Sequence, residues 1–265
     1  MIPAEVRYVR ASSLDEALDA LGEPDAKALA GGQSLLPVLK LRIVRPSVLV
    51  DIGGLGLAGI ETVGDEVRIG ALTTWDRLAS DAALARPALA ALAECAAGVG
   101  DLQVRNRGTL GGSLAHADPA SDVLAVVLAL GARLELRSPE GERSLAASDF
   151  VLGPFTTALG ERELITSVVV PVPEPGSGSA YVSVEHPASG FALAGAAALV
   201  RPGGSSSVAL TGVGARASLV PEGGSLDDVE IYGDRFAPEG YRRHVAVVVV
   251  RRALERARAR AEEDM

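Results

Sequence analysis

Apolar and polar positions follow two periodicities along the chain, one helical and one alternating, which predict short helices mixed with strands. Ser12 or Ser13 precedes apolar residues at helical spacing, and Gly22 follows the last of them, so a capped helix is expected over 14–21. Residues 63–69 and 133–144 alternate around glycine-containing turns, as hairpins do. The same patterns predict further helices over 35–41, 74–78, 87–97, 123–130 and 241–261, and strands over 27–30, 47–52 and 164–170. Residues 181–184, 191–200 and 207–213 are expected to form strands or a mixture of strands and helix.

Two stretches interrupt these patterns. Residues 171–179, with the sequence PVPEPGSGS, are rich in the residues that favour linkers. We therefore expect a domain boundary there, with one domain over 1–175 and a smaller one over 176–265. Residues 104–122 are polar and glycine-rich, and we expect an irregular loop that ends where the helix over 123–130 begins.

Composition and charge narrow the possible functions. The 265 residues are 48% hydrophobic and 22% charged, which excludes a wholly disordered chain, and a net charge of -9 argues against nucleic-acid binding. The single cysteine, Cys95, excludes a disulfide framework or an iron-sulfur cluster ligated within this chain, and its alanine-rich surroundings predict a buried, unreactive thiol. The N-terminus lacks an apolar signal core, and the longest apolar runs are far shorter than the ~20 residues of a membrane-spanning helix. We expect a cytoplasmic protein.

One glycine cluster matches a dinucleotide-binding pattern in spacing alone. Gly54, Gly56 and Gly59 satisfy G-x-G-x-x-G after an expected strand. The following residues, 60–65, are β-branched and lead into another turn, so no helix is available to hold a pyrophosphate. We interpret this cluster as a glycine-rich connection within a sheet.

Two other glycine clusters are better suited to a phosphate. Paired glycines let successive backbone N–H groups converge, and neighbouring hydroxyls add donors. Two such sites suit a diphosphate, although each cluster alone is also compatible with a simple tight turn. Neither contains the lysine of an NTPase phosphate loop. The two clusters comprise Ala30, Gly31, Gly32, Gln33 and Ser34, and Thr109, Leu110, Gly111, Gly112 and Ser113.

Other reactive residues do not assemble into a recognisable catalytic motif. Ser113, His116 and Asp118 share one short segment, which rarely supplies the geometry of a catalytic triad. The histidines lack metal-type spacing. Asp122 is either a turn or capping acid or a partner for the ribose or adenine of a nucleotide. The chain thus has means to hold a nucleotide and few to act on a substrate, so a bound cofactor would have to carry the reaction.

Four motifs in order give the chain a family resemblance. They are AGGQSLLPVLKLR at 30–42, IGALTT at 69–74, RNRGTLGGSLAHADPASD at 105–122 and HPASGFALAGAAA at 186–198. Together they resemble the FAD-binding medium subunits of molybdenum hydroxylases, especially those of aerobic carbon monoxide dehydrogenases and, more distantly, xanthine dehydrogenase flavoproteins. The resemblance extends through nearly the whole chain.

The resemblance implies an α+β fold and a site for FAD. The expected fold is a two-lobed flavin domain of the p-cresol methylhydroxylase or vanillyl-alcohol oxidase type, with lobes of about 1–55 and 56–175, followed by a smaller α+β domain. FAD would lie non-covalently against both glycine clusters. The other implied contacts are Thr73, Asp122, Ile165 and, beside the flavin ring, Phe191. Many relatives have Asn, Asp and Tyr where this chain has Ser113, Gly190 and Phe191.

The resemblance also implies a partner-dependent oxidoreductase. Electrons would come from a molybdopterin large subunit through the [2Fe-2S] clusters of a small subunit to FAD, and then pass to an external acceptor. The expected assembly is a heterohexamer, a dimer of heterotrimers. Two alternatives remain open: a stand-alone flavin oxidase of similar fold, and an assembly subunit without redox activity.

Overall fold

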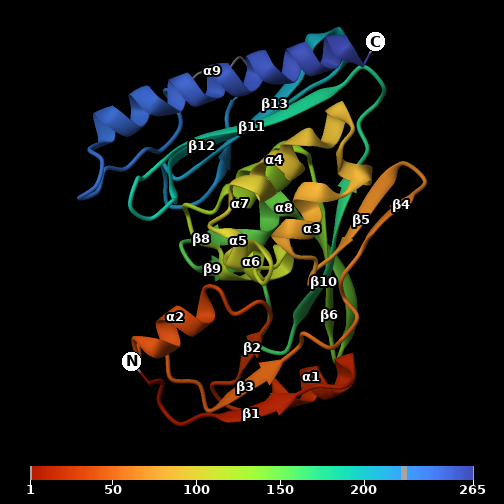
Figure 1. Ribbon diagram of the computed structural model, residues 1–265, viewed down its shortest axis with the longest axis vertical. Coiled ribbons are helices and arrows are strands. Elements are labelled where there is room, and N and C mark those ends of the chain that lie inside the picture. The colour runs from red at the N-terminus through yellow and green to blue at the C-terminus, as the bar shows by residue number, and fades with distance from the viewer. Residues whose placement is uncertain (1, 222–225, 265) are drawn as a thin grey trace.

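A three-stranded parallel sheet forms the N-terminal lobe, at the bottom of Figure 1. The computed structural model describes residues 2–221 and 226–264. The sheet order is β1-β3-β2, and apolar side chains of β3 pack against helix α1, whose first turn is capped by the Ser13 hydroxyl. The elements of this lobe are β1 (Arg7–Arg10), α1 (Leu14–Ala20), β2 (Lys27–Leu29), α2 (Leu35–Lys40) and β3 (Val48–Asp51).

The middle lobe is built on a five-stranded antiparallel sheet of order β4-β5-β10-β6-β7. Its strands are β4 (Ile60–Val63), β5 (Glu66–Gly70), β6 (Arg133–Ser138), β7 (Gly141–Ala146) and β10 (Leu164–Pro171). The helices of this lobe are α3 (Trp75–Ser80), α4 (Ala90–Gly98), α5 (Leu102–Arg105), α6 (Leu110–His116), α7 (Asp122–Ala129) and α8 (Ala147–Phe150), with short 3-10 turns at Ala82–Leu84 and Pro87–Leu89. A small two-stranded ribbon, β8 (Val151–Gly153) with β9 (Thr156–Thr157), follows α8.

An antiparallel sheet of order β11-β12-β13-β14 forms the C-terminal lobe. Helix α9 covers one face of this sheet, and α4 and α7 of the middle lobe pack against the other (Figure 1). Every residue of β12 is consequently buried, which explains its run of small apolar residues. The elements are β11 (Gly178–Glu185), β12 (Ala192–Val200), a 3-10 turn at Pro202–Gly204, β13 (Ser206–Thr211), β14 (Ser218–Leu219) and α9 (Glu239–Glu263).

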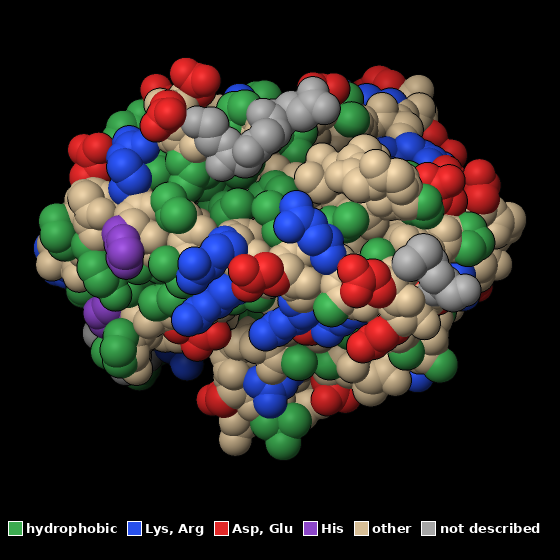
Figure 2. Space-filling view, turned by 90° about the horizontal axis from the view of Figure 1, so that it is seen from above, with side chains coloured by type: hydrophobic (Ala, Val, Ile, Leu, Met, Phe, Trp, Pro, Cys, Tyr) green, Lys and Arg blue, Asp and Glu red, His purple; other side chains and the backbone are tan. Residues whose placement is uncertain are grey.

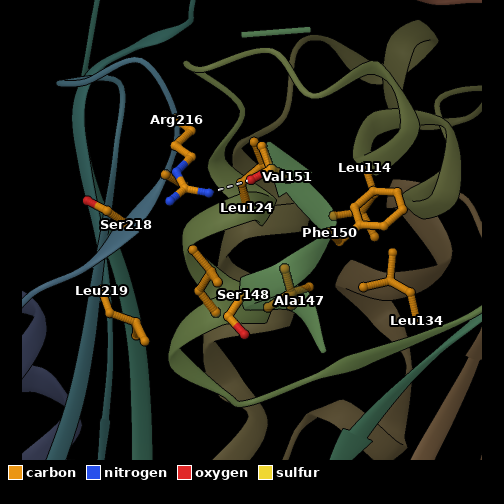
Figure 3. Close-up of a pocket in the computed structure, with 13 residues that line it drawn as sticks. Leu114, Leu124, Leu134, Ala147, Ser148, Phe150, Val151, Arg216, Ser218 and Leu219 are labelled. Atoms are coloured by element: carbon orange, nitrogen blue, oxygen red, sulfur yellow. Dashed lines mark hydrogen bonds between the residues drawn. The ribbon is translucent and has the colours of Figure 1, made fainter. Parts of the chain in front are cut away.

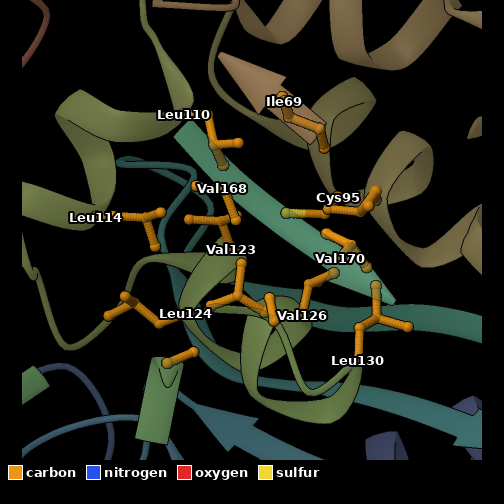
Figure 4. Close-up of a cluster of buried hydrophobic side chains, with 14 of the residues drawn as sticks. Ile69, Cys95, Leu110, Leu114, Val123, Leu124, Val126, Leu130, Val168 and Val170 are labelled. Carbon is orange, nitrogen blue, oxygen red and sulfur yellow. The ribbon is translucent and has the colours of Figure 1, made fainter. Parts of the chain in front are cut away.

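The largest hydrophobic core lies in the middle lobe and extends into the C-terminal lobe. Figure 4 shows Ile69, Val168 and Val170 of the sheet facing Val123 and other apolar residues of α7. Side chains of β11, β12 and β13 belong to the same cluster. Cys95 is fully buried within it, as expected, and burial raises the pKa of its thiol well above the ordinary value. The middle and C-terminal lobes therefore share one core.

This shared core changes the interpretation of residues 171–179. The sequence predicts a linker there, but only its first half is accessible, and residues 176–179 are buried. A Cβ added to Gly178 would lie 2.2 Å from the carbonyl oxygen of Ala257, so α9 packs directly on the backbone of β11. The segment is a tightly packed connection rather than a free linker.

Most of the helices and strands expected from the sequence are present. The largest error of the sequence-based prediction concerns residues 104–122. The expected loop contains α5 and α6, with the side chains of Asp101 and Thr109 as N-caps. Glycine is a poor helix former, which hides α6 in the sequence, but Gly111 and Gly112 occupy its first turn. Residues 53–59 lead into β4 without a helix, as expected, so their glycine pattern does not form a dinucleotide-binding turn.

Charged side chains of both signs lie on one face of the molecule. On the face seen from above in Figure 2, which α9 crosses, Lys and Arg side chains are interspersed with Asp and Glu. Such mixing differs from the single-sign field that gathers nucleic acid. Among the described residues, no helix is long and apolar enough to cross a membrane.

Glu94 connects the middle lobe to the C-terminal helix. Its carboxylate accepts hydrogen bonds from the backbone N–H of Tyr181 at 2.9 Å, from Arg256 at 3.0 Å and from Arg260 at 2.6 Å. Glu94 lies on α4, whereas both arginines lie on α9. Removing the carboxylate would leave the partly buried N–H of Tyr181 without its acceptor and deprive the half-buried Arg260 of its charged partner.

We predict that Glu94→Gln lowers the free energy of unfolding by about 2 kcal/mol, because charge-assisted bonds in a partly buried site are lost. Urea unfolding followed by circular dichroism would measure the change. The matched control is Glu255→Gln, which removes a carboxylate that pairs with Arg251 at 3.9 Å on the exposed side of α9. The control is expected to change stability by less than about 0.5 kcal/mol. Equal effects of the two substitutions would contradict the role given to Glu94.

Candidate functional site

The two glycine clusters lie against each other although they are far apart in sequence. A Cβ added to Gly31 would lie 2.0 Å from the carbonyl oxygen of Arg107 and 2.9 Å from the Cα of Gly108. A Cβ added to Gly112 would lie 3.5 Å from the Cβ of Ala30. The structure therefore brings together, backbone against backbone, the two clusters that the sequence analysis singled out.

The first cluster has a run of free backbone donors. Among the described residues, the N–H groups of residues 31–34 donate to no protein acceptor. Gly32 has a φ of +76°, in the left-handed region that favours glycine, and this conformation turns the chain from β2 into α2. The side chain of Gln33 donates to the carbonyl oxygen of Gly31 at 3.3 Å and stabilises the turn. Consecutive free N–H groups in a turn suit an anionic oxygen.

The second cluster has a different structure from the one expected. Thr109 is the N-cap of α6 and the other four residues begin the helix, and the N–H groups of these four are paired within the protein. Leu110 donates to the carbonyl oxygen of Thr73 at 3.0 Å, and Gly112 donates to the hydroxyl of Thr109 at 3.2 Å. Ser113 donates to the carbonyl oxygen of Thr109 at 3.1 Å. These four N–H groups are therefore not free, as a nest would require, and a contact of this cluster with a cofactor stays a prediction.

The glycines of the second cluster allow close packing. Gly111 donates to the carbonyl oxygen of Ala71 at 2.8 Å, and a Cβ at Gly111 would lie 2.6 Å from the Cβ of Ala71. Any side chain there would push α6 away from the end of β5. A Cβ at Gly112 would similarly lie 2.7 Å from the hydroxyl oxygen of Thr109, the N-cap of this helix. The second cluster thus forms a wall behind the first.

Thr73 and Ile165 lie beneath this wall. The Thr73 hydroxyl accepts from the N–H of Gly59 at 3.0 Å and donates to its carbonyl oxygen at 3.1 Å, and the residue is 1% exposed. Ile165 lies in β10 with its side chain in the core. Both side chains are thus occupied by the protein, and a direct contact of either with a cofactor stays a prediction.

The residues considered for a catalytic triad do not form one. The Ser113 hydroxyl lies 2.9 Å from the hydroxyl of Ser121. The ring of His116 instead packs at a tilt against Phe155, with the ring centroids 5.2 Å apart. Asp118 accepts from the backbone N–H of Ala120 at 2.9 Å, as a turn residue does. Among the described residues, no group of three His, Cys, Asp or Glu side chains could hold a metal ion.

Asp122 has a partner that the sequence analysis missed. It is the first residue of α7, and its carboxylate accepts a hydrogen bond from the hydroxyl of Tyr181 in β11. Burial raises the pKa of Asp122 to about 6, with a further upward effect from Glu185, against the lowering effect of the Tyr181 bond. The sequence holds one signal of this contact, which is Gly195 within the alanine-rich β12. A Cβ at Gly195 would lie 2.2 Å from the Tyr181 hydroxyl, so only glycine leaves room for it.

Phe191 lies at an exposed turn of the C-terminal lobe. It follows the turn between β11 and β12, its carbonyl oxygen accepts from the N–H of His186 at 2.8 Å, and its side chain is 52% exposed. A contact of its ring with a cofactor stays a prediction. Gly190 has a φ of +72°, which explains why glycine suits this turn.

Comparisons with known proteins agree with this arrangement. Residues 4–173 match the family model described as FAD binding domain in molybdopterin dehydrogenase. The chain belongs to this family of FAD-binding subunits. Its cofactor is FAD, and the free N–H groups of residues 31–34 fit the diphosphate of that cofactor.

Individual relatives extend the similarity over the whole chain. The chain is 37% identical to the carbon monoxide dehydrogenase medium chain of Afipia carboxidovorans over 99% of its own length and 100% of that protein. It is 44% identical to the glyceraldehyde dehydrogenase medium chain of Sulfolobus acidocaldarius, covering 76% of this chain and 72% of the relative. The structure of reconstituted CO dehydrogenase from Oligotropha carboxidovorans matches with a TM-score of 0.93 and 36% identity, covering 98% of this chain and 100% of the other. These matches confirm the α+β fold of the FAD-binding family and an oxidoreductase subunit.

We predict that Asp122 makes stability decrease as pH rises. Its pKa of about 6 in the folded protein lies above the ordinary 3.8, so the folded state holds this proton more tightly than the unfolded state. The contribution is complete below about pH 4 and is lost as pH rises through 6, a change of about 2–3 kcal/mol. Urea unfolding of the parent and of Asp122→Asn between pH 4 and 7.5 would measure the difference.

As pH rises from 4 to 7.5, the free energy of unfolding of Asp122→Asn should increase relative to that of the parent. The control is Asp149→Asn, which removes an exposed carboxylate near the start of β8 and should keep the parent's pH profile. A profile for Asp122→Asn that runs parallel to the parent's would show that the buried carboxyl does not titrate as described.

Proposed function

We propose that this chain is the electron-transfer subunit of a molybdenum hydroxylase, in which FAD receives electrons from the [2Fe-2S] clusters of a partner and passes them to an external acceptor. The observation that carries the proposal is the run of free N–H groups at residues 31–34, held against the backbone of Arg107 and Gly108, in a chain of this family. FAD, when bound, supplies the redox chemistry. The protein supplies binding, orientation and electrostatics.

Each cluster has a separate task in this proposal. Residues 31–34 would hold the diphosphate through backbone N–H groups, which need no side chain and tolerate the negative charge. The second cluster would set the position of the first, because Gly112 faces Ala30 and α6 is fixed to Ala71 and Thr73. Phe191, at its exposed turn, would face the flavin ring, as the family resemblance implies.

The iron-sulfur and molybdenum centres are assigned to partners. The chain has one cysteine, the buried Cys95, whereas a [2Fe-2S] cluster takes four protein ligands. Relatives are named as medium chains of enzymes as different as carbon monoxide dehydrogenase and glyceraldehyde dehydrogenase. We infer that the partner subunit, rather than this chain, selects the substrate, and that the complex is a heterohexamer formed by two heterotrimers.

A flavin titration tests the site. We predict that Gly31→Ala weakens FAD binding about 100-fold, because the new Cβ would displace the first cluster from the Arg107 carbonyl and misplace several phosphate donors. Gly32→Ala should weaken binding about 10-fold, because it combines a strained φ with a contact to the Leu36 side chain at 2.9 Å. Quenching of flavin fluorescence on addition of the full chain measures the dissociation constant.

The matched control is Gly64→Ala. Gly64 has a φ of +61° in the β4–β5 turn, and a Cβ there would have no neighbour within 4 Å. The control therefore carries the same backbone strain without touching the site, and its affinity for FAD should equal the parent's. If Gly64→Ala and Gly32→Ala weaken FAD equally, the effect is general destabilisation. If the folded Gly31→Ala protein binds like the parent, FAD does not lie against residues 31–34.

Co-expression with candidate partners tests the assembly. We predict that native mass spectrometry of the purified complex finds this chain, an iron-sulfur subunit and a molybdopterin subunit in a 2:2:2 ratio, and that reduced iron-sulfur clusters reduce the flavin in that complex. A chain that binds FAD, forms no complex and oxidises a substrate alone would identify a stand-alone flavin oxidase. A complex that forms without flavin and keeps its activity would identify an assembly subunit.

A further inference from the structure

A cavity separate from the glycine clusters lies between the middle and C-terminal lobes. Its volume is about 190 Å³, and the segment 216–219 of the C-terminal lobe faces α7 and α8 across it (Figure 3). Thirteen residues line it, from both lobes. A molecule bound there would touch both.

The walls of this cavity are largely apolar. Leu124 lies on α7, Leu134 on β6 and Phe150 on α8, and each side chain is almost fully buried. Leu114, on α6, reaches the same space from behind the second glycine cluster. The floor of the cavity is therefore suited to a hydrocarbon group.

A single charged side chain stands at this cavity. Arg216 is exposed, and one of its terminal nitrogens donates to the carbonyl oxygen of Val151 at 2.8 Å, as the dashed line in Figure 3 shows. Its other guanidinium nitrogens have no acceptor among the described residues. None of the thirteen lining residues is acidic, and Ser148 adds a hydroxyl at the exposed side. The one charge that this arrangement favours in a ligand is negative.

We propose that this cavity binds a small amphipathic anion, a carboxylate whose apolar tail has about six to eight carbon atoms. The tail would lie between Leu128 of α7 and Leu219 of β14, the apolar lining side chains with the most accessible surface, over the buried floor, and the carboxylate would pair with the Arg216 guanidinium. The volume supports this size, because an apolar cavity of about 150 Å³ accommodates benzene and stays free of water. An apolar space of this kind gives water few hydrogen-bond partners, whereas a guanidinium pairs well with a carboxylate.

The ligand would strengthen the contact between the lobes. Because residues 216–219 belong to the C-terminal lobe and the other lining residues to the middle lobe, binding would favour the folded, joined state and raise the melting temperature. The proposal does not depend on the function of the glycine clusters, which neither line the cavity nor supply its charge.

Calorimetric titration of the full chain in the presence of FAD tests the proposal, with octanoate as the probe. We expect one saturable site and a higher melting temperature with octanoate, much weaker binding of octanol, which lacks the charge, and none of acetate, which lacks the tail. Arg216→Gln should weaken octanoate about 10-fold and leave octanol unchanged. Ser148→Phe, at the exposed side, should block the cavity and abolish binding of both.

The matched control is Arg252→Gln, which removes the same charge from an exposed position on α9. It should bind octanoate like the parent. Absence of saturable octanoate binding would overturn the proposal, as would equal affinities in the parent and Arg216→Gln, or binding retained in Ser148→Phe. If Ser148→Phe does not fold, the comparison of Arg216→Gln with Arg252→Gln decides alone. Unchanged FAD affinity in all three variants would show that the effects belong to this cavity.

Discussion

The site depends on one contact, the approach of Gly31 to the carbonyl oxygen of Arg107. With 2.0 Å between that oxygen and the position of a Cβ, only glycine allows the contact. The approach joins the N-terminal lobe to the middle lobe without any side chain between them. It also determines the direction of the following backbone, because the turn at Gly32 is held between this contact and α2. The N–H groups at residues 31–34 stay free because the chain is held from behind.

Glycine also allows close backbone packing between the middle and C-terminal lobes. Gly178 lets α9 lie on the backbone of β11, and Gly195 makes room for the Tyr181 hydroxyl that reaches Asp122. Both glycines lie in strands, where glycine has an entropic cost. That cost is offset because close packing places β11 and β12 between α9 on one side and α4 and α7 on the other. The result is one core shared by two lobes, with polar links at Glu94 and Asp122.

Local patterns explain which parts of the fold the sequence predicts well. The hairpin around Gly64 and the long helix α9 have clear periodicity and turn residues, and both are present. The two glycine clusters were also found, because paired glycines are visible without knowing what surrounds them. Helix α6 was missed because its two glycines oppose helix propensity, whereas its N-cap and the carbonyl oxygens of Ala71 and Thr73 stabilise it. The partner of Asp122 was missed because Tyr181 is distant in sequence.

Comparison of the two clusters shows why a motif alone does not define a binding site. Both have a glycine pair followed within one residue or two by a hydroxyl, and both were interpreted as nests of N–H groups. In the second cluster, tertiary neighbours accept the bonds of Leu110 and Gly111, so its glycines bring α6 close to the sheet. In the first cluster, the nearest atoms on the Cβ side of Gly31 belong to the backbone of Arg107 and Gly108, which presents a carbonyl oxygen there and leaves the N–H groups of residues 31–34 free. Whether a glycine pair binds a ligand or packs a helix is therefore decided by which backbone groups its neighbours occupy, and that information resides in the fold.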